Sequence, residues 1–135
     1  MARMRALLSL LFLAACTTAQ PAQEPPDNYL AGTSWLRIDD EEANPHGARI
    51  AFTENGASGH TGCNRWFTSV THAGEALDFG NVGTTRMACQ TEMQAGTERR
   101  FLEVLAATHY AHYDQEMLVL LDANQQVIAR FNRSE

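Results

Sequence analysis

The sequence contains no lysine, so all ten of its basic residues are arginines, and sixteen acidic residues outnumber them. The formal net charge is −6. Because Arg3 and Arg5 precede every acidic residue, loss of an amino-terminal signal would leave eight arginines against sixteen acids, a balance of −8. An acidic surface repels phosphate backbones, and no basic run is present to attract anionic lipid. The composition therefore argues against a nucleic-acid partner.

Long hydrophobic runs are also scarce, and the one clear example spans residues 6–15. A run of ten residues is too short for a membrane-crossing helix, which needs roughly 20. The run follows two arginines and ends in small residues before Cys16, which is the layout of an export signal. A buried amino-terminal helix is the alternative interpretation.

The letters LAAC at residues 13–16 resemble the lipobox of bacterial lipoproteins. The resemblance implies that residues 1–15 form a signal peptide and that Cys16 becomes the lipidated amino terminus. Two or three acyl chains would anchor the protein firmly, whereas one chain binds only marginally. Thr17, and not aspartate, follows the cysteine. In a host with two membranes, this resemblance implies attachment to the outer membrane, with the folded domain facing the periplasm.

Cysteine is rare as well, and lipidation of Cys16 would leave only Cys63 and Cys89. In an exported chain this even remainder predicts a disulfide. Closing the loop of about 26 residues would stabilise the fold by roughly 3.5 kcal/mol through chain entropy. The sequence leaves open two free buried thiols, or a metal or catalytic site involving His60 or His72. No CxxC or CxxH spacing supports the metal alternative.

Three of the four prolines lie in residues 17–28, which carry no large apolar side chain. Such a segment cannot bury a core and is predicted to be a flexible tether continuing from residue 16, with one folded domain at 29–135. Apolar residues then alternate with polar ones, which predicts antiparallel strands with one buried face. The alternating segments are 33–39, 48–54, 64–72 and 76–80, with an expected turn at 55–59.

Residues 91–107 change to helical spacing, with apolar side chains at Phe101, Leu102 and Leu105. Thr91 and Gln94 have the spacing of a capping box, whereas Gly96 weakens the first turn, so a firm helix is expected only from about residue 97. A turn at 122–125 between two apolar runs predicts a terminal hairpin. The predicted class is α+β, a small curved antiparallel sheet or open barrel with one helix packed on it.

Several stretches together are similar to the META domain, the family of the heat-shock protein HslJ. They are GTSWLRI, SGHTGCNRWF, LDFGNVGTTRMAC and ERRFLEVLAA followed by MLVLLDANQQVIARF. The resemblance implies an incompletely closed β-barrel with a helix, often carried on a short lipoprotein. It also implies links to heat stress, envelope integrity and antibiotic tolerance, without a defined biochemical activity.

The most specific family positions, whose role the resemblance does not define, are Gly62, Asn64, Arg65, Thr85, Arg86 and Met87. We expect Asn64 to satisfy local backbone groups, although it could orient a ligand. Arg65 and Arg86 could clamp an anion, but ordinary ion pairing is the favoured interpretation. Met87 and Met93 are expected to fill gaps in the core.

Two further sets of residues bear on cofactors and ligands. His109 and His112 would point to opposite faces of a strand, so no metal site is predicted, and no cofactor motif is present. The aromatic residues are expected to pack the barrel interior, although a ligand cavity is the alternative. They are Trp35, Phe52, Trp66 and Phe79.

These observations predict a non-catalytic, stress-linked envelope lipoprotein that binds a protein partner or has a structural role. A carrier of a small apolar or amphipathic molecule in the barrel mouth is the alternative. A hydrolase is the third hypothesis. Ser58, His60 and Asp78 supply suitable residue types for it, but no GxSxG pattern surrounds the serine.

Overall fold

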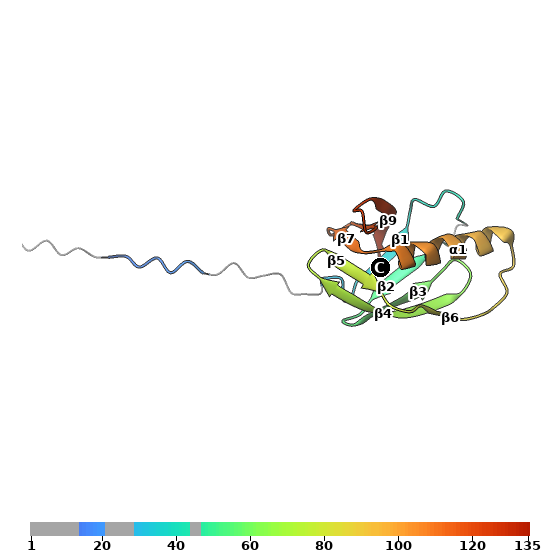
Figure 1. Cartoon of the computed structure of the whole chain (residues 1–135), viewed down its shortest axis with the longest axis horizontal. Coiled ribbons are helices and arrows are strands. Elements are labelled where there is room, and N and C mark those ends of the chain that lie inside the picture. Colours follow the sequence, from blue (N-terminus) through green and yellow to red (C-terminus); the bar gives the residue numbers. More distant parts are fainter. Residues whose placement is uncertain (1–13, 21–28, 44–46) are drawn as a thin grey trace, which may run out of the picture.

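The structure is a computed structural model that describes residues 14–20, 29–43 and 47–135. Most of the predicted signal peptide (1–13) and most of the predicted tether (21–28) lie outside the described residues. Within the described residues the chain forms nine strands and one helix (Figure 1). The strands are β1 Ser34–Arg37, β2 Arg49–Phe52, β3 Gly56–His60, β4 Arg65–Ala73, β5 Ala76–Phe79, β6 Gly83–Thr84, β7 Tyr110–Tyr113, β8 Met117–Leu121 and β9 Val127–Ser134; the helix is α1 Glu92–Ala107.

Eight of these strands form an antiparallel barrel. The order is β3-β2-β1-β9-β8-β7-β5-β4, and β3 also pairs with β4, while β6 adds to the edge of β4. The weakest junction joins β5 to β7, where only Ala76 and Tyr110 are in register. A backbone bond from Leu77 N to His109 O (3.0 Å) supports it. The predicted α+β class, a small barrel with one helix, is confirmed.

The alternating pattern of the sequence correctly indicates which side chains face inward. In β4, Trp66 and Thr68 are buried while Arg65 and Phe67 are exposed. Ile50 of β2 and Leu77 of β5 are buried in the same way. Period two therefore marks the inner face of the barrel.

The expected turn at 55–59 is wrong, because β3 begins at Gly56 and only the preceding residues turn. Gly59 lies between β2 and β4, in register with Ile50 and Trp66. A side chain there would clash with the carbonyl of Arg49. Its absence lets the Trp66 indole reach across β3 and donate to Arg49 O at 3.0 Å. Gly59, which suggested a turn in the sequence, thus allows close packing of neighbouring strands inside the sheet.

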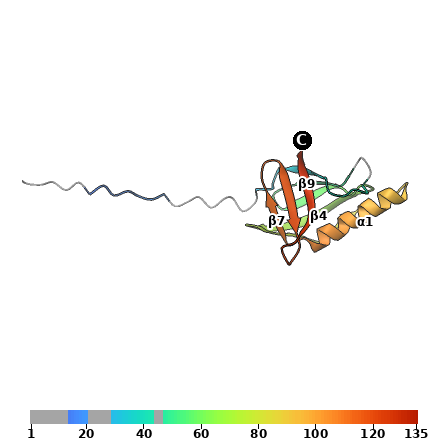
Figure 2. The same ribbon diagram turned by 90° about the horizontal axis from the view of Figure 1, so that it is seen from above.

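Aromatic and branched side chains fill the barrel interior. Trp35, Trp66, Phe101 and Phe131 are all at most 1% exposed. The Phe101 ring from α1 lies 5.4 Å from Trp66 and 6.5 Å from Phe131, between two opposite parts of the sheet. Figures 1 and 2 show α1 lying along one side of the strands. The helix therefore completes the core that the strands begin.

Helix α1 starts at Glu92, earlier than expected, so Gly96 does not delay it. Thr91 is the N-cap and its hydroxyl accepts from Gln94 N at 3.1 Å. The Gln94 side chain accepts from Gln90 N (2.8 Å), one residue before the position that a capping box would use. These two caps offset the low helix propensity of the glycine. Within the described residues, no helix is both long and apolar enough to cross a bilayer.

Candidate functional site

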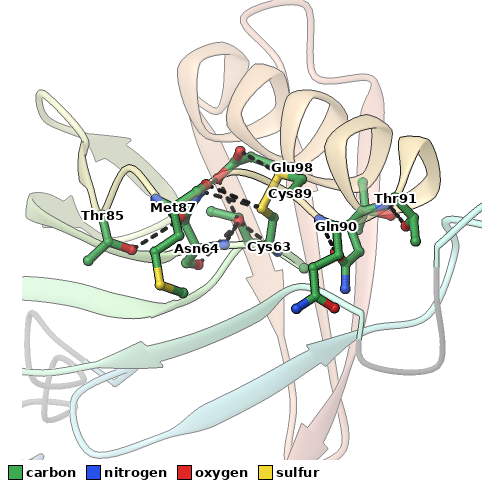
Figure 3. Close-up of a disulfide and its surroundings, with 12 residues drawn as sticks. Cys63, Asn64, Thr85, Met87, Cys89, Gln90, Thr91 and Glu98 are labelled. Atoms are coloured by element: carbon green, nitrogen blue, oxygen red, sulfur yellow. Dashed lines mark hydrogen bonds between the residues drawn. A yellow bond between two sulfur atoms is a disulfide. The ribbon is translucent and has the colours of Figure 1, made fainter.

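The family positions of the sequence meet at one corner of the fold, where the β3–β4 turn faces the start of α1 (Figure 3). Cys63 and Cys89 form a disulfide there, with Cα atoms 5.5 Å apart. The bond joins the β3–β4 turn to the segment that leads into α1. The predicted cysteine pairing is therefore present, and neither thiol is free.

Asn64 lies at the centre of this corner and is 4% exposed. Its amide group donates to Met87 O (3.1 Å) and to the Glu98 carboxylate (3.0 Å). Its side-chain oxygen accepts from Met87 N (2.9 Å) and from the Thr85 hydroxyl (3.1 Å). Every strong donor and acceptor of this amide is thus bound within the chain. Asn64 fastens the 85–89 segment to the barrel and has no free group for a ligand.

Glu98 on α1 and Thr61 are residues of this corner that the sequence did not indicate. The Oε1 of Glu98 accepts from Asn64 and from the Thr61 hydroxyl (2.9 Å), and its Oε2 lies 3.6 Å from Cys89 Sγ. Helical periodicity placed Glu98 on the helix, but no sequence spacing indicates a partner 34 positions away. With both sulfurs joined to each other, Glu98 has no thiolate neighbour with which to share a metal ion.

Gly62 is needed here because the helix approaches it closely. Its φ is +101°, and a Cβ would clash with the side chain of Thr97, which is 1% exposed. Glycine alone adopts this backbone conformation without strain and leaves room for the helix. Gly62 therefore sets the contact distance between the β3–β4 turn and α1.

Four of the six family positions are exposed, namely Arg65, Thr85, Arg86 and Met87. Arg65 and Arg86 are exposed, and within the described residues neither forms the ordinary ion pair that was expected. Met87 is 68% exposed and Met93 is 53% exposed, so the expectation that they fill core gaps is wrong. Met87 contributes to this corner through its backbone, because its C=O accepts from the Asn64 amide nitrogen and its N–H donates to the Asn64 amide oxygen.

The residues considered for catalysis do not form a triad, because Ser58 and His60 line the same groove but Asp78 has a different partner. Asp78 lies 2.9 Å from His109 Nδ1, across the β5–β7 junction. His60 Nδ1 accepts from Gly62 N (3.0 Å), so the nitrogen that a catalytic carboxylate would contact is occupied. His112 lies 3.6 Å from Glu75, so the two histidines of the HYAH segment have separate acidic neighbours.

A surface groove of about 500 Å³ opens beside the disulfide. A second groove of about 590 Å³ continues over the outer face of β2, β3 and β4. The two grooves share Arg49 and His60 in their linings. Both are open to solvent, in contrast to the filled interior of the barrel.

An eight-stranded antiparallel barrel packed against one helix, stapled by a disulfide between the β3–β4 turn and the helix entry, defines a small barrel-and-helix domain. The chain belongs to the META domain family, whose model matches residues 30–135. Among curated proteins, no sequence matches this chain significantly.

Solved structures share this fold. A protein from Burkholderia xenovorans, solved by NMR, is 24% identical with a TM-score of 0.62, covering 87% of this chain and 96% of that one. A duf4847 family protein from Bacteroides vulgatus, solved by crystallography, is 14% identical with a TM-score of 0.58, covering 78% and 95%. At these identities the likeness concerns the fold alone.

Proposed function

We propose that this protein is a lipid-anchored envelope module that acts by binding and not by catalysis. The observation that carries the proposal is the distribution of the three cysteines. Cys16 is free and exposed in an irregular segment before the domain, whereas Cys63 and Cys89 are joined. An exposed thiol directly after a signal-like run is the arrangement that acylation requires, and a disulfide suits an oxidising compartment.

The filled barrel favours a partner that binds to the surface over a small molecule held in the barrel mouth. The four largest interior side chains are at most 1% exposed. The polar corner around Asn64 is satisfied internally, which suits a structural role better than a catalytic one. A stress-linked envelope protein with this design would present a rigid outer face to a partner.

The anchor is tested by replacing one atom. A Cys16→Ser variant expressed in the host should move from the membrane fraction to the soluble envelope fraction, because serine cannot form the thioether to the lipid. A Thr17→Ser variant, which keeps the cysteine, should stay with the membrane. Equal membrane content for Cys16→Ser and the natural chain would contradict the anchor.

The binding role is tested by chemical crosslinking in intact cells, at rest and after heat shock, followed by mass spectrometry of the acylated protein. The proposal expects the same envelope protein to be recovered in repeated experiments. Absence of any reproducible partner under both conditions would contradict it.

A further inference from the structure

Three basic side chains lie side by side on the outer face of the barrel. Arg49 of β2 is in register with His60 of β3, and His60 is in register with Arg65 of β4. Residues directly opposite on antiparallel strands point to the same face. With strands about 4.8 Å apart, the row extends over roughly 10 Å.

Among the described residues this row has no ion-pair partner, although Glu135 lines the same groove. The acidic partners that the structure gives to arginines go to Arg37 and Arg100, and none goes to Arg49 or Arg65. Basic side chains directly opposite one another destabilise a sheet, so an unpaired row costs stability on its own. In a chain with a net charge of −6, such a row stands out.

His60, in the middle of the row, can donate a hydrogen bond from Nε2. Its Nδ1 accepts from Gly62 N at 3.0 Å, which fixes the proton of the neutral ring on Nε2. The ring therefore offers its Nε2–H as a donor to an anion. With an arginine on each side of His60, three side chains can donate hydrogen bonds to the oxygen atoms of one or two carboxylates.

The row borders the groove of about 590 Å³ that crosses these strands. Small residues line much of it, Phe67 is 63% exposed at its side, and Glu135 adds one acidic group. The groove is open to solvent, whereas a small-molecule pocket encloses roughly 70–90% of its ligand. An open groove gains contact area only with an elongated occupant. The small residues that line it are Ser34, Ala51, Ser58 and Gly59.

We propose that this groove binds an extended acidic peptide segment of an envelope protein, with carboxylates on the Arg49–His60–Arg65 row and an apolar side chain on Phe67. Carboxylates two residues apart in an extended chain point the same way and lie about 7 Å apart, which fits within the row. This inference rests on the proposed binding function and names the chemistry of the partner.

The test uses the whole mature chain and a fluorescent, amidated peptide of sequence Glu-Ser-Glu-Ser-Leu, followed by anisotropy. We expect saturable binding that weakens with added salt, and at least tenfold weaker binding of the Gln-Ser-Gln-Ser-Leu peptide. Arg49→Gln and Arg65→Gln should each weaken binding at least fivefold. Arg130→Gln is the matched control, because Arg130 is exposed on β9 outside the groove, and it should change binding less than twofold.

Equal binding of the acid and amide peptides, or equal losses for Arg49→Gln and Arg130→Gln, would overturn the groove proposal. Binding of millimolar inorganic phosphate together with no detectable binding of the peptide would also overturn it, since the row would then be a site for small anions. If Arg49→Gln/Arg65→Gln still crosslinks the same envelope protein in cells, the groove proposal fails while the binding function stands. If the natural chain itself crosslinks no partner, the proposed binding function fails.

Discussion

The side-chain amide of Asn64 donates to the carboxylate of Glu98 at 3.0 Å, joining the β3–β4 turn to α1 across 34 positions of the chain. The same carboxylate lies beside Cys89, so the disulfide and the hydrogen-bond network form one unit. Two different kinds of link, one covalent and one polar, thus hold the helix to the barrel at the same corner. Each link predicts a separate effect on stability.

Replacing Asn64 should destabilise the domain strongly. Asn64→Ala leaves Met87 O, Met87 N and the Glu98 carboxylate without their partner, and we expect a loss of about 2–3 kcal/mol in the free energy of unfolding. Urea denaturation measures it. Asn132→Ala, at an exposed position of β9, should lose less than about 0.5 kcal/mol. Similar losses for the two variants would contradict the role given to Asn64.

Removing the disulfide should cost roughly 3.5 kcal/mol, because the unfolded chain regains the freedom of a 26-residue loop. The double variant Cys63→Ala/Cys89→Ala should show this loss in urea denaturation without reductant. Adding reductant should lower the stability of the natural protein by a similar amount and leave the variant unchanged. If reductant left the free energy of unfolding of the natural protein unchanged, the disulfide would not stabilise the fold.

Glu98 should also protect the disulfide from reduction. Its Oε2 lies 3.6 Å from Cys89 Sγ, where a negative charge opposes both an attacking and a departing thiolate. A repulsion of about 1 kcal/mol at this distance in water corresponds to a roughly fivefold slower rate of disulfide reduction. Glu98→Gln, which keeps an acceptor for Asn64, should therefore be reduced by a small dithiol several times faster. Glu103→Gln, exposed on the same helix, should be reduced at the natural rate, and an unchanged rate for Glu98→Gln would contradict the proposal.

Alkaline pH should weaken the fold through Tyr113. Burial raises the pKa of this tyrosine to about 12, and Tyr29, with its ring 5.9 Å away, adds a smaller repulsion in the same direction. An unfolded tyrosine loses its proton near pH 10. Below about pH 10 the contribution of Tyr113 is fully present, and between about pH 10 and 12 it is lost, because only the unfolded state is deprotonated there.

Urea denaturation of the natural protein at about pH 9 and about pH 11 measures this loss of stability. Tyr113→Phe cannot ionise at this position, so its free energy of unfolding should fall less over the same interval. An equal fall for the two proteins would show that Tyr113 does not contribute.

Local pattern was sufficient to predict most of the fold. Alternation along residues 64–72 correctly indicated the inner and outer faces of β4, and Thr91 correctly indicated the start of α1. Two of the failures come from glycine. The sequence predicts a turn that includes Gly59 and a helix start delayed by Gly96, yet each glycine lies within a regular element. Sequence spacing does not reveal that tertiary packing requires a position without a side chain.

The candidate site was predictable only in part, because its contacts join distant segments. The pairing of Cys63 with Cys89 followed from counting. A structural role for Asn64 was expected from its residue type, but with local backbone groups, whereas its partners Met87 and Glu98 lie 23 and 34 positions away. Glu98 and the Arg49–His60–Arg65 row did not follow from the sequence. They depend on strand register and on the position of the helix, which single-chain periodicity does not define.

The measurement that tests the account most directly is the intact mass of the protein extracted from the membranes of its host, without reductant. We expect a chain that begins at Cys16, carries diacylglycerol on that residue, and gains two hydrogens only after reduction of Cys63 and Cys89. An unacylated amino terminus, or two free thiols in the unreduced folded protein, would contradict the proposed anchor or the disulfide on which the domain depends.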